Sequence, residues 1–191
     1  MKKILILNGS PSGPKGNCAL WIKKIQGQLP RGAEAEVIHL SEVHFGNKLK
    51  KKIKEAPGYV FVTGTYWDSW GSPLQKLLED WTELEGTKAV FGKPCAVFVL
   101  MHSVGGKGVL SRLQGVLSTM GLLIPPMSGM VYSLVSELAL KAPTTHAEDF
   151  WTLTDAKIIL ANLFKATDLN VNWKSWVVDK KNPQRMWIQK K

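Results

Sequence analysis

The chain has 191 residues, a formal net charge of +10, 45% hydrophobic residues and two cysteines. A chain of this length builds one buried core, and its composition is that of a globular protein rather than a fibrous or disordered one. Two cysteines are too few for a disulfide framework or a Cys/His cluster, so we expect no metal site and a reducing, cytoplasmic compartment. The best apolar run, residues 94–101, is far shorter than the roughly 18–20 residues of a membrane span. The positive charge would attract phosphate-bearing partners, but it does not choose among nucleotides, nucleic acid and anionic lipid.

Short apolar runs alternate with amphipathic segments along the chain. The patterns predict strands at residues 3–7, 36–40, 59–63, 94–101 and 122–124, and helices at residues 17–29, 48–54, 73–84, 106–120 and 145–166. Parallel neighbours in a sheet need a crossover element between them. The alternation therefore predicts an α/β fold in three layers, with a five-stranded parallel sheet covered by helices on both faces.

The loop after the first predicted strand, residues 9–17, is rich in Gly, Ser and Pro and opens directly into a helix that Asn17 could cap. Backbone N–H groups of such a loop, together with the helix N-terminus, can surround an anion. Ser10, Ser12 and Asn17 add neutral hydrogen-bond donors, and Lys15 can add charge. From this local chemistry alone, a simple chain-reversing turn explains the loop equally well.

Two later loops carry aromatic side chains and glycines where the third and fourth strands end. The candidate residues are Thr65, Tyr66, Trp67 and Asp68 in one loop, and Ser103, Gly105 and Gly106 in the other. A flat ring system suits aromatic faces and glycine backbone, although a hydrophobic cluster that plugs the loop would also account for the aromatic residues. We expect Tyr66 and Trp67 at a ligand, and Trp81 in the core or at a subunit contact. A lone histidine at a strand end, such as His102, is more often structural, so no catalytic residue is assigned.

Together these loops resemble those of the NADPH-dependent FMN reductases and their flavodoxin-like relatives, over about residues 2–126. Three motifs carry the resemblance: Asn8-Gly9-Ser10-Pro11-Ser12 with Gly16-Asn17-Cys18, the run Thr63 to Gly71 with Leu74-Gln75, and His102 to Gly108. The chain departs from the family pattern at Cys18, Gly64 and Gln75, where the family has a hydroxyl, a proline and a lysine. We interpret Cys18 as a tolerated substitution. The alternative is a thiol whose pKa the helix end lowers.

The resemblance implies a flavodoxin-like oxidoreductase that passes hydride from NADPH or NADH to FMN and on to a flavin, quinone or similar small-molecule acceptor. The implied cofactor-binding residues are Ser10, Ser12, Lys15, Gly16, Asn17, Cys18, Thr65, Tyr66, Trp67, Asp68, Ser103, Gly105 and Gly106. It also implies a homodimer or homotetramer, and we expect no nucleic-acid partner. Two other functions stay open: an electron-carrier flavodoxin, whose usual acidity the charge of +10 opposes, and a flavodoxin-like scaffold that no longer binds flavin.

The last segment, residues 168–191, lies outside the resemblance and is separated here from a flavin-binding domain at residues 1–167. It interleaves Trp173, Trp176 and Trp187 with lysine and arginine. A solvated disordered tail normally lacks aromatic residues, so we expect this tail to dock on its own domain or on a partner subunit. Aromatic residues among basic ones also suit nucleic-acid bases or a lipid interface, and these remain the alternatives.

Overall fold

The computed structural model describes residues 2–143 and 145–179. Five parallel strands form one sheet in the order β2-β1-β3-β4-β5. The strands are β1 Lys3–Asn8, β2 Glu34–His39, β3 Tyr59–Gly64, β4 Cys95–Met101 and β5 Gly129–Ser133. The chain order reverses between β1 and β3, and ligands of doubly wound sheets bind where this reversal occurs. The predicted five-stranded, flavodoxin-like α/β fold is confirmed.

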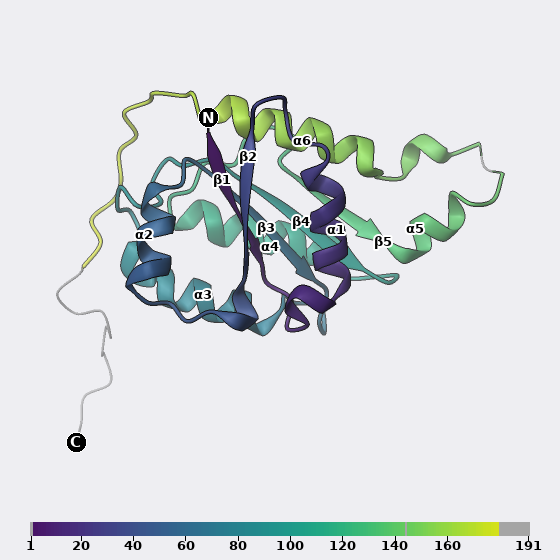
Figure 1. Ribbon diagram of the computed structural model, residues 1–191, viewed down its shortest axis with the longest axis horizontal. Helices are drawn as coiled ribbons and strands as arrows, with labels where there is room; N and C mark the ends of the chain where they lie inside the picture. The colour runs from purple at the N-terminus through teal and green to yellow at the C-terminus, as the bar shows by residue number, and fades with distance from the viewer. Residues whose placement is uncertain (1, 144, 180–191) are drawn as a thin grey trace, which may run out of the picture.

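Helices cover both faces of the sheet (Figure 1). They are α1 Asn17–Gln26, α2 Asn47–Glu55, α3 Ser72–Asp80, α4 Gly106–Thr119, α5 Leu134–Ala139 and α6 Leu153–Ala166, with single 3-10 turns at Gly13–Lys15, Leu40–Glu42, Trp81–Leu84 and Ala147–Asp149. The α1 and α6 helices pack on one face, and α2, α3 and α4 on the other. None of the helices in the described part of the chain is long and apolar enough to cross a membrane.

Each central strand divides its side chains between two hydrophobic cores. In β1, Leu5 and Leu7 pack towards α2, α3 and α4, whereas Ile4 and Ile6 pack towards α1 and α6. Successive side chains of a strand point to opposite faces, so a strand covered on both sides must be apolar at nearly every position. This burial explains why β1, β3 and β4 appear in the sequence as continuous apolar runs.

The predicted fifth strand at residues 122–124 is wrong, because the strand that completes the sheet is β5, Gly129–Ser133. Residues 122–124 form only an isolated bridge between Pro94 and Leu123. The next two residues, Pro125 and Pro126, have no N–H group and cannot extend a ladder. Pairing with β4 resumes at Ser128, whose carbonyl oxygen accepts from the Val97 N–H at 2.9 Å.

The bounds of two predicted helices are also wrong, although the start of the first one at Asn17 is confirmed. The last helix begins at Leu153 rather than at residue 145, because Thr152 and Asp155 form a capping box that fixes its first turn. The α1 helix has Gly16 rather than Asn17 as its N-cap, and it ends at Gln26 rather than at residue 29. The six-residue α5 helix, which Ser133 caps through the Ser136 N–H, is too short for its periodicity to be visible in the sequence.

Residues 168–179 of the tail have no regular secondary structure and run along the edge of the molecule that carries α2 (Figure 1). The Trp173 indole lies against Gly92, where a Cβ would come within 2.9 Å of Trp173 Cδ1. The Trp176 Nε1 donates to Glu85 Oε1 at 3.1 Å. Both indoles stay half-exposed. The other tail residues that the prediction used, Lys180, Lys181, Asn182, Pro183, Arg185, Trp187, Lys190 and Lys191, lie outside the described residues.

Candidate functional site

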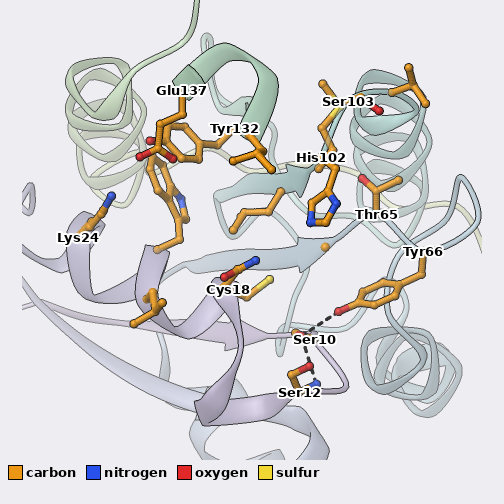
Figure 2. A pocket seen from close by; sticks show the side chains of 18 residues that line it. Ser10, Ser12, Cys18, Lys24, Thr65, Tyr66, His102, Ser103, Tyr132 and Glu137 are labelled. Atoms are coloured by element: carbon orange, nitrogen blue, oxygen red, sulfur yellow. Dashed lines mark hydrogen bonds between the residues drawn. The ribbon is translucent and has the colours of Figure 1, made fainter. Parts of the chain in front are cut away.

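A cavity of about 620 Å³ lies at the carboxyl ends of β1, β3, β4 and β5. This volume falls within the roughly 300–1,000 Å³ of small-molecule sites. Figure 2 shows Ser10 and Ser12 at its base, one wall with Thr65, Tyr66, His102 and Ser103, and a facing wall with Lys24, Tyr132 and Glu137. The cavity therefore occupies the edge of the sheet where the strand order predicts a ligand.

Asn8, the last residue of β1, fixes the shape of the loop at the base of the cavity. Its Nδ2 donates to the Gly13 carbonyl oxygen at 2.9 Å, and its Oδ1 accepts from the Ser10 N–H at 3.1 Å. Gly13 has a φ of +51°, and a Cβ there would collide with Ser41 Oγ, so the turn requires glycine. Asn8 is buried and acts as a positioning residue, a role that the sequence analysis did not assign to it although it opens the first motif.

The Ser10 and Ser12 hydroxyls lie beside the N-terminus of α1. This helix begins without a side-chain cap, so its first N–H groups lack the partners that the rest of the helix provides. A Cβ on Gly16 would lie 2.7 Å from Ser12 Cβ, 3.4 Å from Ser12 Oγ and 3.5 Å from Ser10 Oγ, which would fill the space between the hydroxyls. The uncapped N–H groups and the two hydroxyls are hydrogen-bond donors, and the missing side chain of Gly16 leaves space between them. This arrangement fits a phosphate group.

Cys18 lies in the first turn of α1 and lines the cavity, but its side chain is buried. Burial raises the pKa of the Cys18 thiol to about 12, although the Ser10 hydroxyl beside it acts in the opposite direction. Cys95 of β4 is also free, and burial raises its pKa as well. The helix end therefore does not make Cys18 a thiolate.

We expect both thiols of the native protein to resist labelling, because the thiolate is the reactive form. With a chromogenic disulfide reagent at pH 8, the native protein should react about a hundredfold or more slowly than the urea-unfolded chain, which should titrate two thiols. One thiol that reacts as fast in the native as in the unfolded chain would show that Cys18 is activated. A Cys18→Ser variant serves as the control that assigns the signal.

The loop after β3 is a tight two-residue turn in which Tyr66 and Ser69 pair through both backbone groups. The Tyr66 hydroxyl lies 2.9 Å from Ser10 Oγ, so this ring reaches across to the base of the cavity. Gly64 makes this possible, since a Cβ there would lie 3.0 Å from Tyr66 Cε2. Trp67 and Asp68 form the turn itself with φ of +48° and +55°, a left-handed conformation that is strained for residues with a side chain.

The loop after β4 completes this wall and approaches the turn closely. Gly105 has a φ of +84°, and a Cβ there would collide with the Asp68 carboxylate. The Gly106 N–H donates to Met101 Sδ at 3.3 Å. The backbone carbonyl of His102 accepts from the Val135 N–H at 3.1 Å, which ties this loop to α5.

Two buried polar atoms in the cavity wall have no hydrogen-bond partner within the described protein: Thr65 Oγ1 and Trp21 Nε1. Buried polar groups are nearly always satisfied, and an orphaned donor costs roughly 1–3 kcal/mol. Both atoms have less than 1 Å² of accessible surface, so the structure does not leave them open to a ligand in the cavity.

The structure brings together seven of the thirteen predicted cofactor-binding residues in the cavity lining: Ser10, Ser12, Asn17, Cys18, Thr65, Tyr66 and Ser103. The other six lie around it and do not line it: Lys15, Gly16, Trp67, Asp68, Gly105 and Gly106. Trp67 is fully exposed at the tip of its turn. Trp70, near the end of the same loop, donates its Nε1 to Gln75 Oε1 at 2.9 Å and packs against the core.

The sequence did not reveal the wall formed by Trp21, Lys24, Tyr132, Leu134 and Glu137. Trp21 and Lys24 follow the loop of residues 9–17 at helical spacing, and this spacing was the signal that could have placed them beside the cavity. The others belong to β5 and α5, which the sequence misplaced or hid.

This fold and site define a class: a doubly wound α/β protein with a Gly/Ser loop and an uncapped helix N-terminus at its switch point, and an aromatic cavity above them. A sequence model of the NADPH-dependent FMN reductase family matches residues 2–133. The chain belongs to this family, so it is an FMN-dependent oxidoreductase with NAD(P)H as electron donor. No curated protein is significantly similar to it in sequence.

Solved oxidoreductases share the fold at low sequence identity. An oxidoreductase from Corynebacterium diphtheriae is 17% identical, with a TM-score of 0.66 over 87% of this chain and 97% of that one. FerB, a flavoenzyme NAD(P)H:(acceptor) oxidoreductase from Paracoccus denitrificans, is 19% identical, with a TM-score of 0.63 over 88% of this chain and 96% of its own. EMOB, an NADH:FMN oxidoreductase, is 17% identical, with a TM-score of 0.65 over 84% and 88% of the two chains.

Proposed function

We propose that the base of the cavity holds the FMN phosphate and that the wall formed by the loops after β3 and β4 holds the flavin ring. The observation that carries this assignment is the uncapped N-terminus of α1 beside the Ser10 and Ser12 hydroxyls. Asn17, exposed in the first turn of the same helix, adds a side-chain amide.

When bound, FMN supplies the hydride and electron transfer, and the protein supplies binding, orientation and exclusion of water. Tyr66 bridges the two parts of the site, because its hydroxyl contacts Ser10 while its ring packs over Gly64. The acceptor we propose is a small aromatic molecule such as a flavin or quinone.

The visible spectrum of the purified protein tests the flavin assignment. We expect flavin absorbance, or its appearance on adding FMN, and rapid bleaching when NADPH is mixed anaerobically in a stopped-flow instrument. A protein that binds FMN but stays oxidised would be an electron carrier. A colourless protein that ignores FMN would support a scaffold that has lost the cofactor.

We further propose a homodimer or homotetramer in the cytoplasm. Leu20, Val104 and Leu134 are apolar, largely exposed and part of the cavity lining, so a second copy could cover them. Two free, buried cysteines are compatible with a reducing compartment. Light scattering of the eluted protein measures the assembly, and a monomer would contradict the proposal.

We propose that the tail after residue 167 docks on the folded domain or on a partner subunit, as the contacts of Trp173 and Trp176 suggest. Deleting residues 169–191 should lower the melting temperature or dissociate an oligomer, because the deletion removes the contacts that Trp173 and Trp176 make with the folded domain. If the truncated protein keeps its stability and assembly but no longer binds DNA or anionic vesicles, the tail is a binding segment instead.

A further inference from the structure

A histidine outside the cavity contacts the residue that shapes the loop of residues 9–17. His39 is the last residue of β2, which lies beside β1 at the edge of the sheet (Figure 1), and it pairs with Asn8, the last residue of β1. The two side chains meet, with Asn8 Nδ2 2.9 Å from His39 Nδ1. His39 does not line the cavity, so it reaches the loop through Asn8.

Two backbone groups of the loop fix the orientation of the Asn8 amide. The Ser10 N–H only donates, so the atom that it meets at 3.1 Å is Asn8 Oδ1. The Gly13 carbonyl oxygen only accepts, so the atom that it meets at 2.9 Å is Asn8 Nδ2. An amide nitrogen carries two hydrogens, and the second one is left for His39. The hydrogen-bond network therefore determines which end of the amide faces the histidine.

This orientation determines the protonation state of His39 while the loop is assembled. An amide nitrogen does not accept, so His39 Nδ1 is the acceptor and carries no proton. A neutral imidazole has one donor and one acceptor nitrogen, so the proton of His39 is on Nε2. A charged imidazole would instead direct an N–H from Nδ1 at an N–H of Asn8. The fully buried Asn8 amide would then lose one of its three partners.

No carboxylate within the described residues binds His39 and holds it in the charged form. The ionisable side chains on the elements around it are Lys2 and Lys3 at the start of β1, Lys15 and Glu42 of the two adjoining 3-10 turns, Lys23 and Lys24 of α1, and Glu34 and Glu36 of its own strand. None of these forms an ion pair or a hydrogen bond with His39, and Glu36 is paired with Lys3 and Lys52. Histidine changes its charge between about pH 5 and 8, so pH alone can alter this contact.

We propose that His39 is a positioning residue for the FMN phosphate, which acts through Asn8 and only in its neutral, Nε2-protonated form. His39 holds Asn8, and Asn8 in turn holds Ser10 and Gly13 of the loop. A loop that is already ordered binds its ligand more tightly than a loop that the ligand must order. The inference rests on the proposed function and adds a dependence of cofactor binding on pH.

The coupling of the proton to FMN has a defined direction. At pH 8 the neutral His39 accepts from Asn8, and the loop keeps its shape. As the pH falls, His39 takes up a proton, the acceptor is lost, and the affinity for FMN decreases. By linkage, bound FMN makes this protonation harder by the same factor. Two other effects accompany it, because the FMN phosphate itself takes up a proton near pH 6 and because a charged imidazole attracts a phosphate.

Two variants of His39 separate these effects. His39→Asn keeps an acceptor, because its side-chain carbonyl oxygen is as many bonds from Cα as Nδ1, but this side chain does not titrate. His39→Leu removes the acceptor at every pH. The control is His44→Asn, which replaces an exposed histidine outside the cavity lining by the same residue. Fluorescence titration of each apoprotein gives the Kd for FMN at pH 8 and pH 5.5, and circular dichroism verifies that each variant is folded.

At pH 8 we expect His39→Asn to bind FMN within twofold of the wild type and His39→Leu to bind it about fivefold or more weakly, because a buried N–H loses its partner. At pH 5.5 the wild type should bind about fivefold or more weakly than His39→Asn, since only the wild type loses the acceptor. The protonation of the phosphate is common to both proteins and cancels in this ratio. His44→Asn should match the wild type within twofold at both pH values.

A second measurement does not require flavin. A long-range ¹H–¹⁵N spectrum of the apoprotein with labelled histidine should show His39 with its proton on Nε2 at pH 8 and with both nitrogens protonated at pH 5.5. His39→Asn identifies the signal by removing it from the four histidines of the chain. A proton on Nδ1 at pH 8 would overturn the proposal, because that nitrogen could not accept from Asn8.

A ratio of the wild-type Kd to the His39→Asn Kd that stays constant between the two pH values would also overturn it. So would a ratio that falls at pH 5.5, because attraction between the charged imidazole and the phosphate would then dominate. Equal affinities of His39→Leu and the wild type at pH 8 would contradict the role of the acceptor; if His39→Leu does not fold, the pH comparison with His39→Asn decides. A wild-type protein that does not bind FMN at pH 8 would contradict the proposed function, and the spectrum of the apoprotein would still test the contact with Asn8.

Discussion

Replacing Ser12 and Asn17 together by alanine is expected to weaken FMN binding at least tenfold. Both residues line the base of the cavity beside the uncapped N-terminus of α1, where we place the phosphate. A hydrogen bond to a charged group contributes about 1.5–3 kcal/mol, and about 1.4 kcal/mol corresponds to a tenfold change in affinity. The loss of two such bonds leaves the remaining backbone N–H groups to hold the phosphate.

Fluorescence titration of the apoprotein with FMN measures this change. Ser118→Ala, an exposed serine at the far end of α4, is the control and should leave the Kd unchanged. The melting temperature of the flavin-free double variant should stay close to that of the parent, since both side chains are exposed. An unchanged Kd in the double variant would place the phosphate elsewhere.

Trp81→Ala is expected to lower the free energy of unfolding by about 3–5 kcal/mol, a large share of the 5–15 kcal/mol typical of a domain. Trp81 is fully buried, as the core alternative in the sequence analysis predicts, and meets the rings of Tyr59 and Phe61 edge-on at 5.4 and 5.8 Å between centroids. Truncation leaves a cavity that these rigid rings cannot close.

Urea unfolding followed by circular dichroism gives this difference. Trp81→Phe should cost much less, because it keeps a ring and because the Trp81 Nε1 has no partner among the described residues. Trp67→Ala removes a fully exposed indole and should change the unfolding free energy by less than about 0.5 kcal/mol. If Trp81→Ala were no more destabilising than Trp67→Ala, the packing described here would be incorrect.

The sequence predicts correctly those elements of the fold whose own residue pattern shows how they are buried or where they end. Two-sided burial makes β1, β3 and β4 visible as apolar runs, and Gly121, at a φ of +99°, ends α4 where the pattern predicts. The prediction of the fifth strand fails because the short apolar run has the composition of a strand, while the two prolines that follow it have no N–H groups with which to extend the pairing. Neither that run nor its isolated bridge to Pro94 could be distinguished from a strand without the partner in view.

In the site, too, residues that are close in sequence could be predicted and residues that are distant in sequence could not. Ser10, Ser12, Asn17 and Cys18 are close in sequence and therefore recognisable as one loop. The facing wall of the cavity joins α1 to β5 and α5, and no local pattern predicts that Trp21 stacks on Tyr132, more than a hundred residues away. Nor could composition show that Trp67 points outward, since that depends on the left-handed backbone of its turn.

That turn has a consequence for anyone who engineers this protein for heat resistance. A two-residue hairpin turn with both φ values positive favours Asn-Gly, whereas this chain has Trp67-Asp68. Exchanging the pair for Asn-Gly should stabilise the fold by about 1–2 kcal/mol, or roughly 2–8 °C in melting temperature for a chain of this size. The same exchange deletes a fully solvent-exposed indole beside the mouth of the cavity. Selection for thermal stability would therefore favour Asn-Gly at these two positions, whereas selection for a contact made by the exposed indole would favour keeping Trp67.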